Sequence, residues 1–285
     1  MTRRVFVSNA GAGVCLALGA FSQSRPPTAM GIASTTFSNA RNNALDFLER
    51  CRTLGAGGMQ TQLNGDLAQL RARAEAAGMV IEGEAPLPRN GSTAVFEQAL
   101  RDAKQAGAKS VRVAALSGRR YETFATADSW NQWREQTLAA LRLAVPVAER
   151  LKVPLALENH KDWVVEEHEQ LLKTYSSEYL GVCLDFGNNI ALLDDPMEVV
   201  ERLAPYTITT HVKDMAVQPY EDGFLLSEVP LGSGILDLPK IVATIRKARP
   251  AASFMLEMIT RDPLKVPCLT EKYWAPFPEI GRAHV

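Results

Sequence analysis

The segment Val153-Pro-Leu-Ala-Leu-Glu158 is a short apolar run that ends in a carboxylate. Three later segments repeat this arrangement: Gly181-Val-Cys-Leu-Asp185, Thr207-Ile-Thr-Thr-His211 and Phe254-Met-Leu-Glu257. A short, largely apolar run is typical of a buried strand in a parallel sheet. The polar residue that closes each run therefore predicts a group of functional side chains where the carboxyl ends of the strands meet.

The rest of the chain alternates strand-like and helix-like segments, which is the pattern of βα units. We expect strands at 30–35, 57–61, 79–82, 110–114, 154–158, 181–185, 208–212 and 253–258. We expect helices at 44–54, 66–77, 93–106, 129–151, 165–175, 197–203 and 238–247. Eight strands in a chain of 285 residues predict one (β/α)8 TIM barrel, which needs about 250 residues. Because no helix is expected after the last strand, we expect the barrel to be truncated at its C-terminal helix.

Both ends of the chain are expected to lie outside the barrel, which should occupy residues 29–278. The segment Thr2-Arg-Arg-Val-Phe-Val7 is a twin-arginine pattern, and uncharged sequence follows it to Ser24. Residues 1–28 are therefore predicted to be an export signal and linker, which implies the twin-arginine export machinery as a partner and a periplasmic location. Residues 279–285 match the translation of a sequencing-adapter read-through, so we expect them to be a sequencing or cloning artefact.

Charge and cysteine content narrow the function classes. The chain carries 31 basic and 32 acidic residues. This balance disfavours nucleic acid as a partner, because duplex binding needs a basic face. The four cysteines are scattered without CxxC or zinc-type spacing, so neither a disulfide framework nor a thiolate metal site is indicated. An oligomer is compatible with the sequence.

Strand alternation predicts where the four polar residues point. Side chains two residues apart share a face of a strand, so Glu158 shares a face with Ala156, and Asp185 with Cys183. The opposite faces carry bulky apolar residues and should pack against the helices. The residues expected to point together toward the barrel axis are Glu158, Asp185, His211 and Glu257.

Three carboxylates and one imidazole at one place predict a bound cation. The carboxylates would repel one another strongly unless a cation lay among them. Three oxygen ligands and one nitrogen ligand, with room for substrate, suit Mn²⁺, Mg²⁺ or Co²⁺ better than a thiolate-preferring metal. A single Glu or His at a strand end is usually only a rim residue, but this set requires four coincidences of position and face. We expect one divalent ion, with Mn²⁺ as the first candidate.

Five motifs together resemble the xylose isomerase-like barrel superfamily, and most closely its sugar phosphate isomerase/epimerase branch. They are Glu158-Asn-His160, Asp185-Phe-Gly-Asn188, His211-Val-Lys-Asp214, Leu231-Gly-Ser-Gly-Ile-Leu-Asp237 and Leu256-Glu257. The resemblance follows the order and spacing of the family over residues 30–263.

The resemblance implies that the four residues bind one metal and that Glu158 and Glu257 also form an acid/base pair. One of them would remove a proton next to the carbonyl of a sugar or keto-sugar, and the other would return it, which is isomerisation or epimerisation. Epimerases of this family often have a histidine three residues after the metal-binding aspartate. This chain departs from that pattern, because Asn188 stands there.

Three further side chains are candidates for contact with the substrate. His160 and Lys213 each lie two positions beyond a metal ligand, and Asn188 takes the place of the family histidine. His160 either donates to a sugar hydroxyl or is a rim histidine. Lys213 either holds an oxyanion or pairs with Asp214 or another rim acid. We expect His168 to lie at the surface. Arg119 and Arg120 either bind an anionic group or, as is common for a loop, face solvent, and Trp130 and Trp133 either wall a sugar site or pack at helical spacing, which we favour.

Other functions of such a barrel remain as alternatives. A lyase or dehydratase on keto-sugars or inositol-derived ketones would use the same metal, and an export signal favours such extracellular breakdown of unphosphorylated carbohydrate. A barrel that binds sugar without catalysis is a further alternative, although intact ligands argue against it. The superfamily also includes abasic-site nucleases, which use a histidine-rich cluster of several metals. Apart from His284 in the expected artefact, only His160, His168 and His211 are available here, so that function is excluded.

Overall fold

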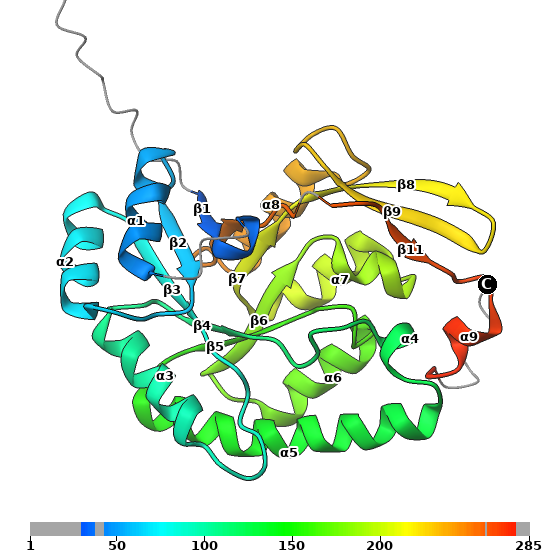
Figure 1. Cartoon of the computed structure of the whole chain (residues 1–285), viewed down its shortest axis with the longest axis horizontal. Coiled ribbons are helices and arrows are strands. Elements are labelled where there is room, and N and C mark those ends of the chain that lie inside the picture. Colours follow the sequence, from blue (N-terminus) through cyan, green and yellow to red (C-terminus); the bar gives the residue numbers. More distant parts are fainter. Residues whose placement is uncertain (1–29, 38–42, 260, 278–285) are drawn as a thin grey trace, which may run out of the picture.

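The computed structural model describes residues 30–37, 43–259 and 261–277; the expected export segment 1–28 and the expected artefact 279–285 lie outside them. Eight parallel strands form a closed barrel in the order β1-β10-β7-β6-β5-β4-β3-β2, as expected for a TIM barrel (Figure 1). The barrel strands are β1 Met30–Ala33, β2 Gly58–Thr61, β3 Val80–Glu84, β4 Val111–Val113, β5 Leu155–Glu158, β6 Leu180–Asp185, β7 Thr207–Val212 and β10 Ser253–Leu256.

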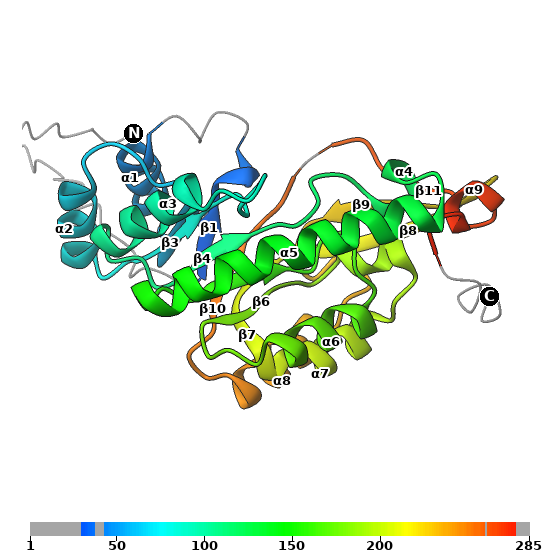
Figure 2. The same ribbon diagram turned by 90° about the horizontal axis from the view of Figure 1, so that it is seen from below.

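Helices surround the barrel, and the longest of them, α5, runs along one side of the molecule (Figure 2). The long helices are α1 Ala44–Thr53, α2 Leu67–Ala77, α3 Ala94–Gln105, α5 Ala127–Leu151, α6 Val165–Tyr175, α7 Pro196–Leu203 and α8 Leu238–Ala248. Short helices are α4 Arg120–Thr123 and α9 Glu271–Trp274, with 3-10 turns at Ser34–Thr36, Asn188–Leu192 and Ala204–Tyr206. None of the helices in the described part of the chain is long and apolar enough to cross a membrane.

Side-chain caps explain where several helices begin. The side chain of Asn43 accepts hydrogen bonds from two backbone N–H groups at the start of α1, and Asp66 accepts one at the start of α2. Asp195 caps α7 in the same way and is followed by Pro196, whose fixed backbone angle suits the first helical position. These local signals are visible in the sequence, which is why the expected and observed helix bounds agree to within a few residues.

The expected division of the strand faces is confirmed. Leu155 and Leu157 of β5 lie in the hydrophobic core that includes helix residues such as Leu171 and Val199. Arg112 of β4 pairs in register with Ala156, and its side chain reaches Glu158 on the same interior face. The bulky residues therefore fill the layer between strands and helices, and the ligand face turns to the barrel axis.

No strand was expected within residues 213–237 or 262–278, but both segments contribute to a second sheet. Strands β8 Asp214–Tyr220 and β9 Gly223–Val229 form an antiparallel hairpin, and β11 Leu264–Val266 pairs with β9. This sheet extends away from the barrel beyond the carboxyl end of β7 (Figures 1 and 2). The pairing of β11 with β9 joins segments far apart in the chain, which local sequence does not report, but β8 and β9 form a local hairpin whose turn at Glu221-Asp222-Gly223 was overlooked.

Candidate metal centre

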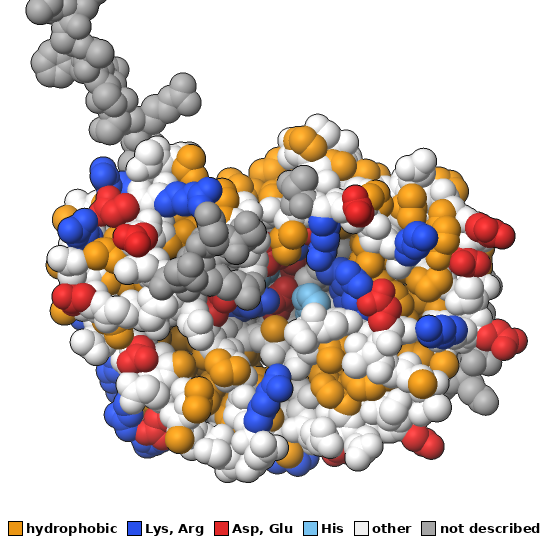
Figure 3. Space-filling model, in the orientation of Figure 1, with side chains coloured by type: hydrophobic (Ala, Val, Ile, Leu, Met, Phe, Trp, Pro, Cys, Tyr) orange, Lys and Arg blue, Asp and Glu red, His pale blue; other side chains and the backbone are white. Residues whose placement is uncertain are grey.

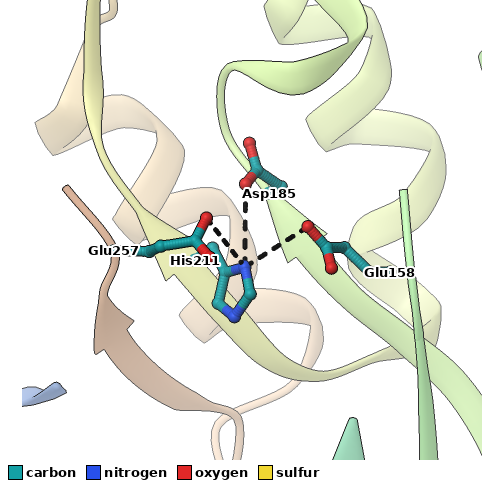
Figure 4. A group of neighbouring side chains, drawn as sticks. All are labelled: Glu158, Asp185, His211 and Glu257. Carbon is teal, nitrogen blue, oxygen red and sulfur yellow. Dashed lines mark ion pairs between the residues drawn. The ribbon is translucent and has the colours of Figure 1, made fainter. Parts of the chain in front are cut away.

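The four predicted ligands converge. Glu158 and Asp185 end β5 and β6, His211 lies near the end of β7, and Glu257 directly follows β10. In the sheet, Asp185 and Met255 both lie opposite His211, which brings the three strand ends into one register. One ligand atom from each of the four residues lies within 4.8 Å of those of the others (Figure 4).

The imidazole of His211 lies at the centre of the group. Its Nδ1 atom is 3.3 Å from Glu257 Oε2, 3.5 Å from Glu158 Oε1 and 3.7 Å from Asp185 Oδ2 (Figure 4). All four side chains are buried, and Nδ1 forms no hydrogen bond with any residue that the structure describes. A buried nitrogen that faces three carboxylate oxygens without a hydrogen bond is the arrangement expected around a cation.

The other side of the ring determines which nitrogen can bind a metal. His211 Nε2 lies 2.7 Å from Gln60 Oε1, and the Gln60 amide nitrogen donates to Glu82 Oε2 at 3.0 Å. Glu82 also accepts from Thr209 Oγ1 at 2.7 Å, which holds the glutamine in this orientation. Because the glutamine oxygen can only accept, Nε2 carries the hydrogen, and neutral His211 then presents its lone pair at Nδ1. The donor set therefore fits a divalent ion.

Charge also governs the protonation of His211. Burial alone would lower its pKa, but the nearby carboxylates outweigh burial and raise the pKa well above its usual value. A proton and a metal ion would thus compete for the same nitrogen.

Two cations, Arg112 and Lys213, hold the ligand carboxylates in their ionised form. Arg112 donates to Glu158 Oε2 through Nε at 2.7 Å and through a second guanidinium nitrogen. Lys213 Nζ lies 2.7 Å from Asp185 Oδ2 and 2.6 Å from Glu257 Oε2. Burial raises the pKa of Glu158 and Glu257, but Arg112 and His211 around the first and His211 and Lys213 around the second outweigh it, so both pKa values lie below the usual range.

Arg112, Gln60 and Glu82 were not among the predicted site residues. They lie in strands β2, β3 and β4, and their side chains face the barrel interior, as the four ligands do. A polar side chain on the interior face was therefore also present in three of the first four strands.

The structure places the three substrate-contact candidates beside the ligands. Asn188 donates to Glu158 Oε1 at 3.2 Å. The pKa of His160 falls to about 4, because its ring is largely buried and lies near Lys161. Lys213 pairs with Asp185 and Glu257 rather than with the neighbouring Asp214.

Asp214 instead holds the glycine loop. Its carboxylate accepts from the backbone N–H groups of Gly232 and Gly234 at 2.9 Å each. A side chain at position 234 would collide with that carboxylate and with the backbone of Met215, which explains the glycine. The glycine loop is thus hydrogen-bonded to the residue that follows Lys213 in the chain.

Two expectations of surface exposure were wrong. His168 is fully buried, and neither ring nitrogen forms a hydrogen bond with a described residue. Arg120 is also buried: it donates to Glu167 at 2.7 Å and to the backbone oxygen of Pro276, and it stacks on Trp130. Charged and polar residues on a polar stretch usually face water, but here the C-terminal segment covers Arg120. The expected packing role of the tryptophans is confirmed, since Trp130 stacks on Trp133 at 4.7 Å.

Comparison with known proteins identifies the family. The model of xylose isomerase-like TIM barrels matches residues 48–275, and the chain belongs to this family. A curated relative, 3-oxo-isoapionate decarboxylase from Pectobacterium atrosepticum, is 33% identical over 134 residues, which is 46% of this chain and 49% of the relative. The chain thus matches about half the length of that protein.

Solved structures show the same fold. The alignment with a structure of L-ribulose 3-epimerase covers 83% of this chain and 83% of the epimerase chain, with a TM-score of 0.62 and 18% identity. A second structure is a xylose isomerase-like TIM barrel protein from Mycobacterium smegmatis in complex with magnesium. The alignment covers 87% of this chain and 95% of that protein, with a TM-score of 0.60 and 17% identity. The relatives named for an activity are enzymes, an epimerase and a decarboxylase among them.

Proposed function

We propose that this chain is a divalent-metal-dependent isomerase or epimerase that removes a proton next to the carbonyl of a sugar or keto-sugar. The observation that carries the proposal is the position of Glu158 and Glu257, which lie on either side of His211 in one buried group (Figure 4). Two carboxylates so placed can reach a substrate from two directions, as proton removal and return require.

A divalent ion, Mn²⁺ first, held by Glu158, Asp185, His211 and Glu257 would act as a Lewis acid that stabilises the negative charge developing on the substrate oxygens. The protein's own residues prepare the proton transfer. Arg112 keeps Glu158 ionised, and Lys213 keeps Glu257 ionised while Thr35 Oγ1 donates to its other oxygen at 2.7 Å. Each glutamate is therefore held in the ionised form that a base requires. Return of the proton to the opposite face of that carbon gives an epimer, and return to the neighbouring carbon gives an isomer.

A decarboxylating lyase on a keto-sugar acid is the second candidate. An ionised glutamate bound by an arginine is a weak base, and Arg112 binds Glu158 through two nitrogens. Loss of carbon dioxide needs no base: the electrons of the breaking C–C bond pass to the carbonyl, and the carbon then takes up a proton. The sequence likeness to 3-oxo-isoapionate decarboxylase favours this alternative.

We further propose export to the periplasm through the twin-arginine machinery. The support is the Arg3-Arg4 pattern and the uncharged segment that follows it. Such a location favours a sugar without a phosphate group as substrate.

Deuterated water separates the candidates. The protein loaded with Mn²⁺ is incubated with a panel of free keto-sugars and 3-keto sugar acids, and the products are followed by NMR and by carbon dioxide release. Deuterium next to the carbonyl together with a new epimer or isomer supports the first candidate. Carbon dioxide release without exchange into neutral sugars supports the second. A protein that binds these sugars and Mn²⁺ but catalyses neither change would be a sugar-binding barrel, and the proposal would be wrong.

A further inference from the structure

A small hollow next to the ligand group is lined by two basic and two acidic side chains. Lys161, Asn188, Ser227, Glu228, Arg261 and Asp262 are among the residues that line it. Figure 3 shows that this face of the molecule is hollowed, with basic, acidic and histidine side chains at the floor. The hollow adjoins the ligand group through Asn188, which donates to Glu158 Oε1.

Lys161 is bonded to an amide rather than to a carboxylate in the described part of the chain. Its side chain is buried, with only 5% of the residue exposed, and Nζ donates to Asn188 Oδ1. Among the residues that the structure describes, no carboxylate forms an ion pair with Lys161, whereas Lys213 is paired with Asp185 and Glu257. A buried ammonium without a counter-charge is costly, so such a group usually has a functional partner.

The pKa of Lys161 reflects its burial and the charges around it. Burial, and next the charge of Lys213, lower the pKa to about 8; Arg261 acts in the same direction, whereas Asp185 and Glu158 raise it. Two acids also line the hollow, but Glu228 is already engaged: it lies 3.8 Å from Lys213 and 3.9 Å from Arg261. Asp262 is exposed to solvent, where its charge is screened.

Asn188 places this charge close to the reacting centre. Its amide oxygen faces Lys161, which only donates, and its amide nitrogen faces Glu158, which only accepts when ionised. The orientation of the amide is therefore fixed by its two neighbours. One amide group separates the ammonium from a metal ligand, so a substituent close to the substrate carbonyl can reach Lys161.

We propose that Lys161, assisted by Arg261, binds a carboxylate of the substrate, which makes the substrate a keto-sugar acid. This inference rests on the proposed function, because it places the carboxylate relative to the carbonyl at the metal centre. A single negative charge matches one uncompensated ammonium. A doubly charged phosphate is larger than a carboxylate, and its second charge would have no buried ammonium to meet it in this small hollow.

Three matched sugars test the charge requirement. The Mn²⁺-loaded protein is titrated calorimetrically with 2-keto-D-gluconate, with D-fructose, which has CH₂OH in place of the carboxylate, and with D-fructose 1-phosphate. We expect the acid to bind most tightly. Lys161→Met should weaken binding of the acid about 10- to 100-fold, the usual effect of losing a hydrogen bond to a charged group, and should weaken D-fructose binding much less, so that the preference for the acid falls. Lys161→Arg should restore part of the preference.

Controls keep the outcomes separate. Lys247→Met makes the same change at the exposed end of α8 and should have no effect. Arg261→Gln, at an exposed position, should weaken acid binding to a smaller extent and serves if Lys161→Met fails to fold. A wild-type protein that prefers the phosphate, or that binds the acid no more tightly than D-fructose, overturns the inference. Metal binding and deuterium exchange into neutral keto-sugars require no anion, so they test the proposed function independently.

Discussion

His211 Nε2 and Gln60 Oε1 lie 2.7 Å apart across the interior of the barrel, joining β7 to β2. This hydrogen bond ties the metal-facing imidazole to a glutamine that is itself held by Glu82. A histidine ligand commonly donates its second nitrogen to such a partner, which fixes both the tautomer and the ring orientation. The metal centre therefore depends on strands from both halves of the barrel.

Gln60→Met should lower metal affinity without unfolding the protein. Methionine is similar in length, but its thioether sulfur is only a weak acceptor. The hydrogen would then no longer be fixed on Nε2, and Nδ1 would be less available to the metal. Loss of such a partner typically costs about 10- to 100-fold in metal affinity. The measurement is a Mn²⁺ titration against a competing chelator, with the exposed Gln69→Met on α2 as the matched control. Equal affinities in the two variants would show that the hydrogen bond does not orient the ligand.

Glu158→Gln and Glu257→Gln should abolish proton exchange even when fully loaded with metal. An amide still offers an oxygen to the ion but cannot take a proton at neutral pH, and loss of a general base costs about 10²- to 10⁴-fold in rate. Asp185→Asn should act mainly through metal affinity. Metal occupancy and deuterium exchange are measured for all three variants at saturating Mn²⁺. Near wild-type exchange in both loaded glutamine variants would refute the acid/base assignment.

Arg112→Met should move the acid limb of the activity profile to higher pH. Burial raises the pKa of Glu158 and the charge of Arg112 lowers it; without that charge the pKa rises. Glu158 must be ionised to accept a proton, so activity should fall at low pH and recover as pH rises. Arg112→Lys keeps the positive charge and should shift the acid limb of the pH profile less. The rate of deuterium exchange is recorded against pH at measured metal occupancy. A limb that stays in place would mean that ionisation of Glu158 does not control the rate.

His168→Leu should make the protein less sensitive to acid. Burial lowers the pKa of His168 to about 4, so the unfolded chain binds a proton between about pH 6.5 and pH 4 that the folded chain does not. Its contribution to stability is therefore present above pH 6.5 and is lost as pH falls. Between pH 7.5 and pH 5, the free energy of unfolding of the wild type should fall by about 2 kcal/mol more than that of the variant.

Urea unfolding of both proteins at the two pH values measures this difference. His160 is unsuitable as the target, because it lies beside the ligand group and its replacement would also disturb the site. A free-energy difference between wild type and His168→Leu that does not change with pH would show that His168 does not titrate differently in the folded protein.

Local patterns in the sequence determined the barrel and its ligand group. Helix α6 was expected at 165–175 and occupies Val165–Tyr175, because its apolar spacing and its first-turn acids are local features. The convergence of the four ligands followed from strand alternation, since a period of two decides which side chains face the axis. These properties depend only on neighbouring residues and on the rule that parallel strands end at one edge.

Tertiary structure alone decided which charges meet at the site. Arg112 binds Glu158 from 46 residues away, and Gln60 binds His211 from 151 residues away. The burial of His168 and Arg120, the pairing of β11 with β9 and the unpaired ammonium of Lys161 also depend on segments that are distant in the chain. The physical reason is that pKa, burial and ion pairing are set by whichever groups lie within a few ångströms in space, whereas alternation along a strand is already complete in the order of the residues.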